Sequence, residues 1–165
     1  MLLQQFNEAS RAQLDEILRP CVDNPRWIDE IATARPFTTL SQLFSAALAA
    51  ADPFTPTEVA AAMAHHPRIG ERPAGNSAEA EHSRREQSGV DPADRELARA
   101  LAEGNRAYEE KFGQVFLIRA AGRTPSDILT ALDRRLANTP EQETPIVASQ
   151  LREIAVLRLQ GVLQP

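Results

Sequence analysis

Hydrophobic residues recur every three or four positions along most of this chain, which is the spacing of one face of an α-helix. Two such stripes are Leu97, Leu101, Tyr108 and Phe112, and Ile128, Leu129, Leu132 and Leu136. Three further helices are predicted over residues 10–20, 24–34 and 38–51. The one convincing extended segment, residues 115–119, is too short to form a sheet, so we expect a buried non-helical connector there.

Four segments carry the same helix-start pattern: a capping side chain, then a proline, then an acid or amide at the third helical position. They begin at Thr55, Asp91, Thr124 and Thr139. The oxygen of the cap accepts a hydrogen bond from a free backbone N–H, and the proline has a preset φ where no donor is needed. Most of the 12 prolines therefore mark helix boundaries rather than disorder.

These patterns predict an all-α fold, a compact single-domain bundle of about eight helices. We expect one domain over residues 1–165, because a chain of this length buries a sizeable core. Hydrophobic residues make up 42% of the sequence and charged residues 25%, a balance typical of a globular protein.

The charge and the remaining composition exclude several classes of function. A net charge of -5 gives no indication of nucleic-acid binding, and the single cysteine, Cys21, excludes an internal disulfide framework. No apolar run approaches the roughly 20 residues that a membrane span needs. The N-terminus lacks the pattern of a signal peptide, and the last three residues are not a peroxisomal address. A cytoplasmic location is expected.

The predicted helix between Ser77 and Gly89 has almost no hydrophobic stripe. One face carries a mixture of small and polar residues, namely Ala80, Ser83, Glu86, Gln87 and Val90. The opposite face carries Glu81, Arg84, Arg85 and Ser88. Such a helix either lies solvated on the surface or lines a polar pocket.

Two polar residues interrupt apolar stripes of other helices. Arg158 falls on the inward face of the last predicted helix, where its guanidinium needs an anion: a core carboxylate, a chain end or the carboxylate of a ligand. Asn105 interrupts the stripe between Leu101 and Tyr108, and we expect it to bond the backbone of a neighbouring loop.

His66 is the candidate acid–base residue. Because His66 precedes Pro67, helical backbone angles are disfavoured for it. We therefore expect His66 at the end of the helix that begins near Thr55. A helix C-terminus and a carboxylate such as Glu86 both stabilise an imidazolium. We therefore expect the pKa of His66 to be raised from about 6.5, which would let it hold and donate a proton at neutral pH.

Four motifs, spread in order over nearly the whole chain, resemble those of the 2-oxo-4-hydroxy-4-carboxy-5-ureidoimidazoline (OHCU) decarboxylase family. They are His66-Pro67-Arg68-Ile69-Gly70; Ser83-Arg84-Arg85-Glu86-Gln87 with Gly89; Asn105, Tyr108, Lys111-Phe112-Gly113 and Phe116-Leu117-Ile118; and Ile154-Ala155 with Arg158-Leu159. Many relatives carry an acidic residue where this chain has Arg68, which would change the charge of the pocket.

The resemblance implies an all-α homodimer that converts OHCU to (S)-allantoin and carbon dioxide in urate degradation, without a cofactor or metal. It implies catalytic roles for His66 as proton donor and Glu86 as its acidic partner. The residues that it implies in substrate binding are Pro67, Ser83, Arg84, Arg85, Glu86, Gln87, Phe116, Leu117, Ile118, Arg119, Ala120 and Arg158.

Two other functions fit parts of the sequence. His65, His66, His82 and Glu86 could form the metal site of a hydrolase, although adjacent histidines do not easily ligate one ion with tetrahedral geometry. A non-catalytic helical adaptor is the second alternative. It predicts an exposed apolar groove and no concave polar pocket.

Overall fold

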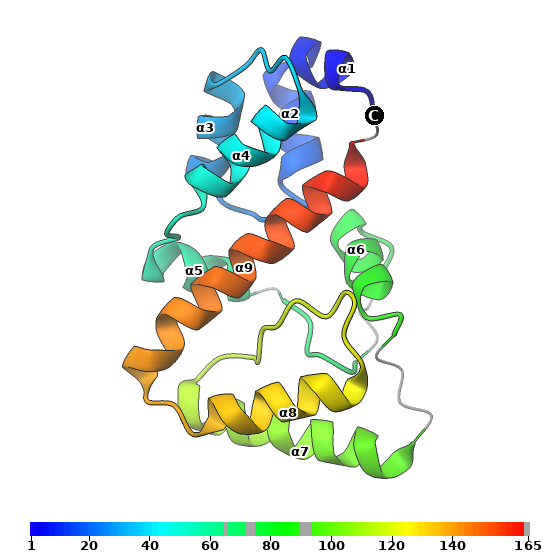
Figure 1. Ribbon diagram of the computed structural model, residues 1–165, viewed down its shortest axis with the longest axis vertical. Helices are drawn as coiled ribbons and strands as arrows, with labels where there is room; N and C mark the ends of the chain where they lie inside the picture. The colour runs from blue at the N-terminus through cyan, green and yellow to red at the C-terminus, as the bar shows by residue number, and fades with distance from the viewer. Residues whose placement is uncertain (65, 72–74, 90–93, 164–165) are drawn as a thin grey trace.

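The structure, a computed structural model, describes residues 1–64, 66–71, 75–89 and 94–163 (Figure 1). In chain order its helices are α1 (Leu3–Glu8), α2 (Arg11–Leu18), α3 (Pro25–Thr33), α4 (Leu40–Ala50), α5 (Pro56–Met63), α6 (Ala78–Glu86), α7 (Arg95–Phe112), α8 (Pro125–Leu136) and α9 (Pro140–Val162). The predicted all-α fold is confirmed. The helix missed by the sequence analysis is α1, whose capping residue is Leu2 and therefore gives no polar start signal. Within the described ranges, no helix has the length and apolar character needed to cross a bilayer.

Three of the four predicted helix starts are confirmed. Thr55, Thr124 and Thr139 each cap a helix whose first residue is proline, and each accepts a hydrogen bond from a backbone N–H three residues later. The fourth start, at Asp91, lies outside the described residues. Helix α7 begins instead at Arg95 with Asp94 as its cap, because the Asp94 carboxylate accepts from the Glu96 N–H at 2.8 Å.

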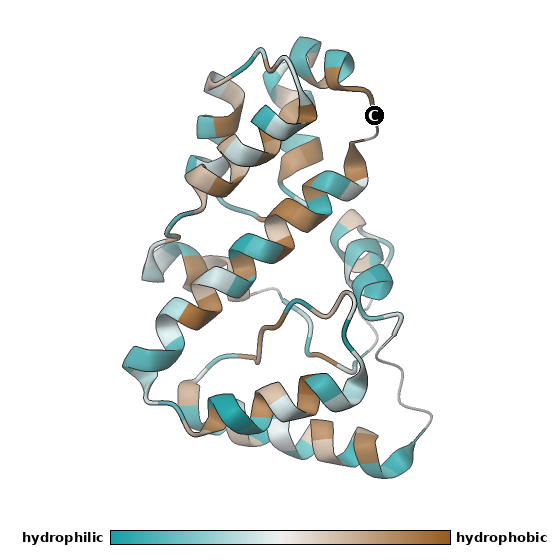
Figure 2. Ribbon diagram, in the orientation of Figure 1, coloured by the Kyte–Doolittle hydropathy of each residue, from teal (hydrophilic) through white to brown (hydrophobic). Residues whose placement is uncertain are grey.

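The buried apolar residues form two cores, and helix α9 runs diagonally between the parts of the molecule that contain them (Figures 1 and 2). The larger core lies among α1–α5 and α9, and the smaller core lies between α7, α8 and the connector that follows α7. Gly113, with φ of 70°, ends α7 in the left-handed conformation that glycine adopts without strain.

The predicted buried connector is confirmed and separates the two cores. Residues 115–120 are non-helical. Leu117 packs into the larger core, whereas its neighbours Phe116 and Ile118 pack into the smaller one, as alternation in an extended chain requires. Side chains satisfy its buried backbone: Arg135 Nη1 donates to the Leu117 carbonyl at 2.6 Å, and the Arg119 N–H donates to Gln150 Oε1 at 2.9 Å.

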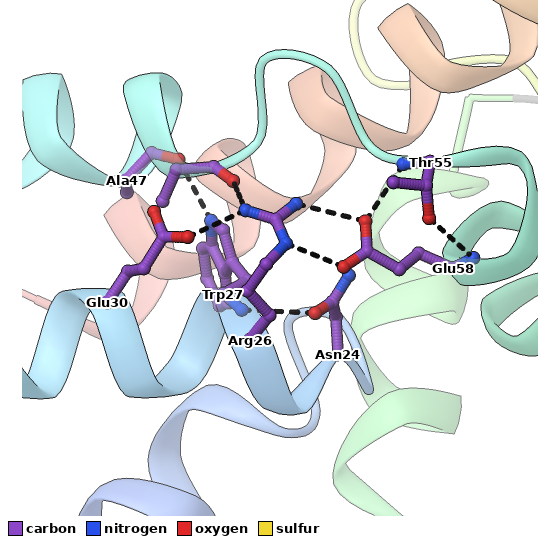
Figure 3. A network of polar contacts seen from close by, with 8 residues as sticks. Asn24, Arg26, Trp27, Glu30, Ala47, Thr55 and Glu58 are labelled. Carbon is purple, nitrogen blue, oxygen red and sulfur yellow. Dashed lines mark hydrogen bonds and ion pairs between the residues drawn. The ribbon is translucent and has the colours of Figure 1, made fainter.

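A polar network on α3 fixes the position of α5, the helix that leads to His66 (Figure 3). Arg26 donates from Nε and Nη2 to the two carboxylate oxygens of Glu58, at 2.6 and 2.9 Å, and from Nη1 to the carbonyl of Ala50 at 2.8 Å. The hydrogen bonds from Arg26 lower the pKa of Glu58 to about 2. The network therefore joins the start of α5 to α3 and to the end of α4.

Candidate active site

His66 lies just beyond the C-terminal end of α5, in a loop that two other helices hold in place. Its backbone N–H still donates to the carbonyl of Met63 at 3.2 Å, and the loop then turns away. Gln87, which follows α6, accepts from the Gly70 N–H at 2.9 Å, and Asn105 on α7 donates to the Ile69 carbonyl at 2.9 Å. The predicted loop-binding role of Asn105 is thus confirmed.

A cavity of about 220 Å³ opens beside His66. Four of the predicted site residues line it, namely His66, Pro67, Ser83 and Arg158. They come from the loop after α5, from α6 and from α9, so the polar face of α6 does line a pocket. A further wall is the connection between α2 and α3, with Cys21 and Val22 buried and Arg19 and Asp23 exposed at the mouth.

Arg158 is buried on the inward face of α9, as predicted, and the anion that it needs is a carboxylate of α6. Its Nε and Nη2 donate to Oε1 and Oε2 of Glu86 at 2.6 and 3.0 Å, which is a bidentate pair. Nη2 also donates to Ser83 Oγ at 3.3 Å, and Nη1 donates to the Pro20 carbonyl at 3.3 Å. Four of the five N–H donors of Arg158 are therefore engaged within the protein.

The Nε2 atom of His66 is buried and has no hydrogen-bond partner among the described residues. Its Nδ1 lies 3.4 Å from the Pro67 carbonyl. Because a carbonyl only accepts, this contact places a proton on Nδ1, so that in the neutral ring the lone pair is on Nε2.

The prediction that the pKa of His66 is raised is wrong. Burial first, and the Arg158 charge second, lower the pKa of His66 to about 4, and the Pro67 carbonyl and Glu86 oppose them only in part. Glu86 was expected as a nearby carboxylate that stabilises the imidazolium, whereas its two oxygens bind Arg158. His66 is consequently neutral at neutral pH.

The comparisons with known proteins agree with the family resemblance of the four sequence motifs. The family model described as OHCU decarboxylase matches residues 7–160. The chain belongs to the OHCU decarboxylase family. It is 27% identical over 161 residues to the 2-oxo-4-hydroxy-4-carboxy-5-ureidoimidazoline decarboxylase of Haloferax volcanii, a match that covers 96% of this chain and 94% of that protein.

Other relatives of this OHCU decarboxylase family member are longer. The chain is 32% identical over 142 residues to the uric acid degradation bifunctional protein TTL of Arabidopsis thaliana, which covers 84% of this chain but 44% of that protein. Similarly, it spans 32% of the uric acid degradation bifunctional protein of a Bacillus species, at 25% identity over 99% of this chain. The fold matches a crystal structure of OHCU decarboxylase in the presence of (S)-allantoin, with a TM-score of 0.71, 28% identity and coverage of 88% and 96% of the two chains.

Several residues that the family resemblance implies in binding lie away from the His66 cavity. Arg84 is exposed and donates to the Gly75 carbonyl at 2.8 Å, and Gln87 bonds the loop that carries His66. Arg85 and Glu86 line a second cavity of about 360 Å³, which shares Arg158 with the first. Residues 116–120 pack between the two cores, and Arg119 within them pairs with Glu153 at 3.0 Å.

Arg68 does not change the charge of the His66 cavity, contrary to expectation. Its guanidinium pairs with Glu109 on α7, and both residues line a separate cavity of about 340 Å³ between the loop and α7. A basic residue at this position is therefore balanced by a carboxylate outside the candidate active site.

The α2–α3 wall of the cavity was not predicted from the sequence. Pro20 supplies a carbonyl to Arg158, and Cys21 lies buried against the cavity with its thiol donating to the Ile17 carbonyl at 3.5 Å. Burial raises the pKa of Cys21 to about 12, so the thiol stays neutral and acts as an apolar wall. Nothing in the local pattern marks residues 19–23, because their role depends on packing against α9.

The two alternative functions gain no support from the geometry. Among the described residues, no three His, Cys, Asp or Glu side chains come together as metal ligands, and His65 of the suggested metal cluster lies outside them. The large hydrophobic residues exposed in the described ranges are Met1, Leu2 and Leu48; the first two precede α1, whereas Leu48 lies on α4. The His66 cavity, with the polar side chains of Ser83 and Arg158 in its lining, is the feature that the adaptor alternative does not predict.

Proposed function

We propose that this protein is a carboxy-lyase that converts OHCU to (S)-allantoin and carbon dioxide in urate degradation, without a cofactor. The observation that carries the proposal is the cavity in which the unpartnered imidazole of His66 lies beside Ser83 and the engaged guanidinium of Arg158. The relative from Haloferax volcanii, which the chain matches over almost its full length, is a decarboxylase of this substrate by name.

The size and polarity of the cavity suit such a substrate. OHCU is a small, polar, anionic ring, and a cavity of about 220 Å³ lies below the roughly 300–1,000 Å³ of pockets for drug-sized ligands. Ser83 Oγ and the remaining Nη1 N–H of Arg158 can each bond a ring carbonyl or hydroxyl. We assign Pro67 to the wall against which the ring packs.

The neutral state of His66 changes its proposed role. Loss of carbon dioxide leaves an electron pair that the carbonyl and imine-like groups of the substrate can delocalise, so the protein has to move protons and stabilise charge. A neutral imidazole accepts a proton before it donates one. We propose that Nε2 takes the proton of the substrate hydroxyl and returns a proton to one face of the ring. One further proton from solvent balances the conversion of a carboxylate into a neutral product.

Glu86 has an indirect role in this proposal. Its carboxylate holds Arg158, and Arg158 in turn holds Ser83, so Glu86 positions the two side chains that bind the ring. Gln87 and Asn105 position the loop that carries His66. We propose that Arg84, Arg85 and residues 116–120 support these elements, and that the active protein is a cytoplasmic homodimer, as the family resemblance implies.

The test is turnover of freshly generated OHCU by the purified protein, followed by the optical activity of the allantoin formed. We expect decay much faster than the spontaneous reaction and a single enantiomer, because one face of the ring receives the proton. Decay at the spontaneous rate in the presence of the protein, or a racemic product, would contradict the proposal.

A further inference from the structure

The mouth of the His66 cavity carries charged side chains that take no part in the proposed proton transfer. The buried part of the lining contains Cys21, Ser83 and Arg158, whereas Arg19, Asp23 and Glu79 are exposed. An anionic substrate must pass this ring of charges before it reaches His66. The position of its carboxylate in the bound state is therefore decided by the cations that line the cavity.

Arg158 is poorly suited to bind a carboxylate of the substrate. Its charge is matched by Glu86, and the two donors that form its fork, Nε and Nη2, already hold the two Glu86 oxygens. A single Nη1 N–H remains, since the Pro20 carbonyl takes the other. A bidentate carboxylate needs two parallel N–H groups on one guanidinium. Binding one at Arg158 would break the contact that fixes α6 to α9.

Arg19 has the pair of free, parallel N–H groups that Arg158 lacks. It lies at the C-terminal end of α2, with 48% of its side chain exposed. Its one side-chain contact among the described residues runs from Nη1 to Asp23 Oδ1 at 2.6 Å, so Nε and Nη2 are not engaged there. Exposed ion pairs of this kind contribute little stability, so Asp23 competes only weakly for the guanidinium.

We propose that Arg19 binds the carboxylate of the anionic substrate at the mouth of the cavity, and that Asp23 competes with the substrate for it. The inference rests on the proposed function, because the carboxylate belongs to OHCU. A hydrated cation at the mouth raises the rate of encounter and the affinity. It does not hold the departing carboxylate in a tight buried clamp, which would stabilise the ground state more than the transition state.

The test compares Arg19→Gln with Arg11→Gln, measuring kcat and KM for OHCU at low and high salt. Arg11 is the control, because it is also an exposed arginine of α2 with carboxylate partners, Asp15 and Asp29, and it does not line the cavity. We expect Arg19→Gln to raise KM about three- to tenfold with little change in kcat, and to reduce the salt dependence of kcat/KM. We expect Arg11→Gln to behave as the wild type and Asp23→Asn to lower KM.

A second measurement separates this inference from the proposed function. (S)-allantoin has no carboxylate, so its inhibition constant should be the same in Arg19→Gln and wild type. If the wild type turns over OHCU but Arg19→Gln keeps the wild-type KM, the inference is wrong and the proposed function stands. An equal weakening of OHCU and allantoin would also overturn it, because the effect would then not depend on charge. If the wild type fails to turn over OHCU, the proposed function itself fails.

Discussion

Two buried arginine–glutamate pairs join the last helix to the rest of the molecule, and they differ in what surrounds them. Arg135 on α8 pairs with Glu143 near the start of α9, with 7% and 2% of the two side chains exposed. Arg158 near the end of α9 pairs with Glu86 on α6, with 6% and 14% exposed. The chemistry of the two pairs is the same, so their environments decide what each one does.

The Arg135 pair is fully enclosed by its own partners. Glu143 Oε1 accepts from Tyr108 Oη and from Arg135 Nε, both at 2.6 Å, and Oε2 accepts from Asn138 at 2.9 Å. The guanidinium also lies over the ring of Phe116, 4.5 Å from its centroid. Such a pair is retained only where every group is satisfied, because the cost of desolvating two charges is high.

The Arg158 pair, in contrast, adjoins a cavity and a ring nitrogen without a partner. A buried polar group that is left unsatisfied costs free energy, and such sites recur where function requires them. The difference between the two pairs teaches that burial and charge alone do not mark an active site. We propose that the combination of an engaged ion pair, an empty volume and an unsatisfied imidazole does.

The largest expected effect comes from His66→Gln, which removes the unsatisfied ring from the cavity. We expect kcat for OHCU to fall about 10²- to 10⁴-fold, the usual contribution of acid–base catalysis. The free energy of unfolding should change by no more than about 1 kcal/mol, because the ring makes few polar contacts. Steady-state kinetics and urea denaturation of the same preparation measure the two quantities.

His82→Gln is the matched control for this variant, because His82 is half-buried on α6 and lines the other cavity. Its turnover should stay within a few-fold of the wild type. Equal losses in both variants would favour a shared metal site over the proposed acid–base role. Undiminished turnover in His66→Gln would place the catalytic group elsewhere.

The next effect is on stability, and it tests the enclosed pair. Arg135→Met leaves Glu143 as a buried charge without its partner, which costs about 3–5 kcal/mol of unfolding free energy. Turnover per folded molecule should not change, because Arg135 does not line the His66 cavity. Chemical denaturation and activity below the melting temperature measure the two effects.

Arg134→Met, at the exposed neighbouring position of α8, should leave stability nearly unchanged. If Arg135→Met does not fold, Tyr108→Phe removes a single hydrogen bond to Glu143 and should cost about 1–2 kcal/mol. Arg158→Met should show the reverse pattern, with lost turnover and a smaller loss of stability, since Glu86 is more exposed than Glu143. A loss of turnover per folded molecule in Arg135→Met would remove the distinction between the two pairs.

The sequence predicts the features that depend on local pattern. Thr55, Thr124 and Thr139 are recognisable caps because a cap, a proline and an acid or amide lie within four residues. The inward position of Arg158 follows from the helical spacing of its neighbours, and the non-helical connector follows from its short extended pattern.

Features that depend on distant packing could not be predicted in the same way. The carboxylate that binds Arg158 lies 72 residues earlier in the chain, and nothing local selects Glu86 over other acids. The pKa of His66 depends on how much water the fold removes from the ring, and desolvation outweighs the nearby carboxylate. The α2–α3 wall could not be predicted for the same reason, since Arg19 lines the cavity only because the fold brings the end of α2 near the end of α5.

The smallest expected effect is the pH dependence of stability that His66 confers. Its pKa is about 4 in the folded protein and about 6.5 when unfolded, so between these values the unfolded chain binds a proton that the folded protein does not. Stability from this residue is therefore complete above pH 6.5 and falls as the pH drops toward 4, by at most about 1.4 kcal/mol per pH unit. Urea denaturation of wild type and His66→Gln at pH 7, 6 and 5 should show a steeper fall in the wild type. Parallel curves would mean that the imidazole of His66 is hydrated in the folded state. The cavity would then no longer contain the unsatisfied group that distinguishes it from the enclosed Arg135 pair.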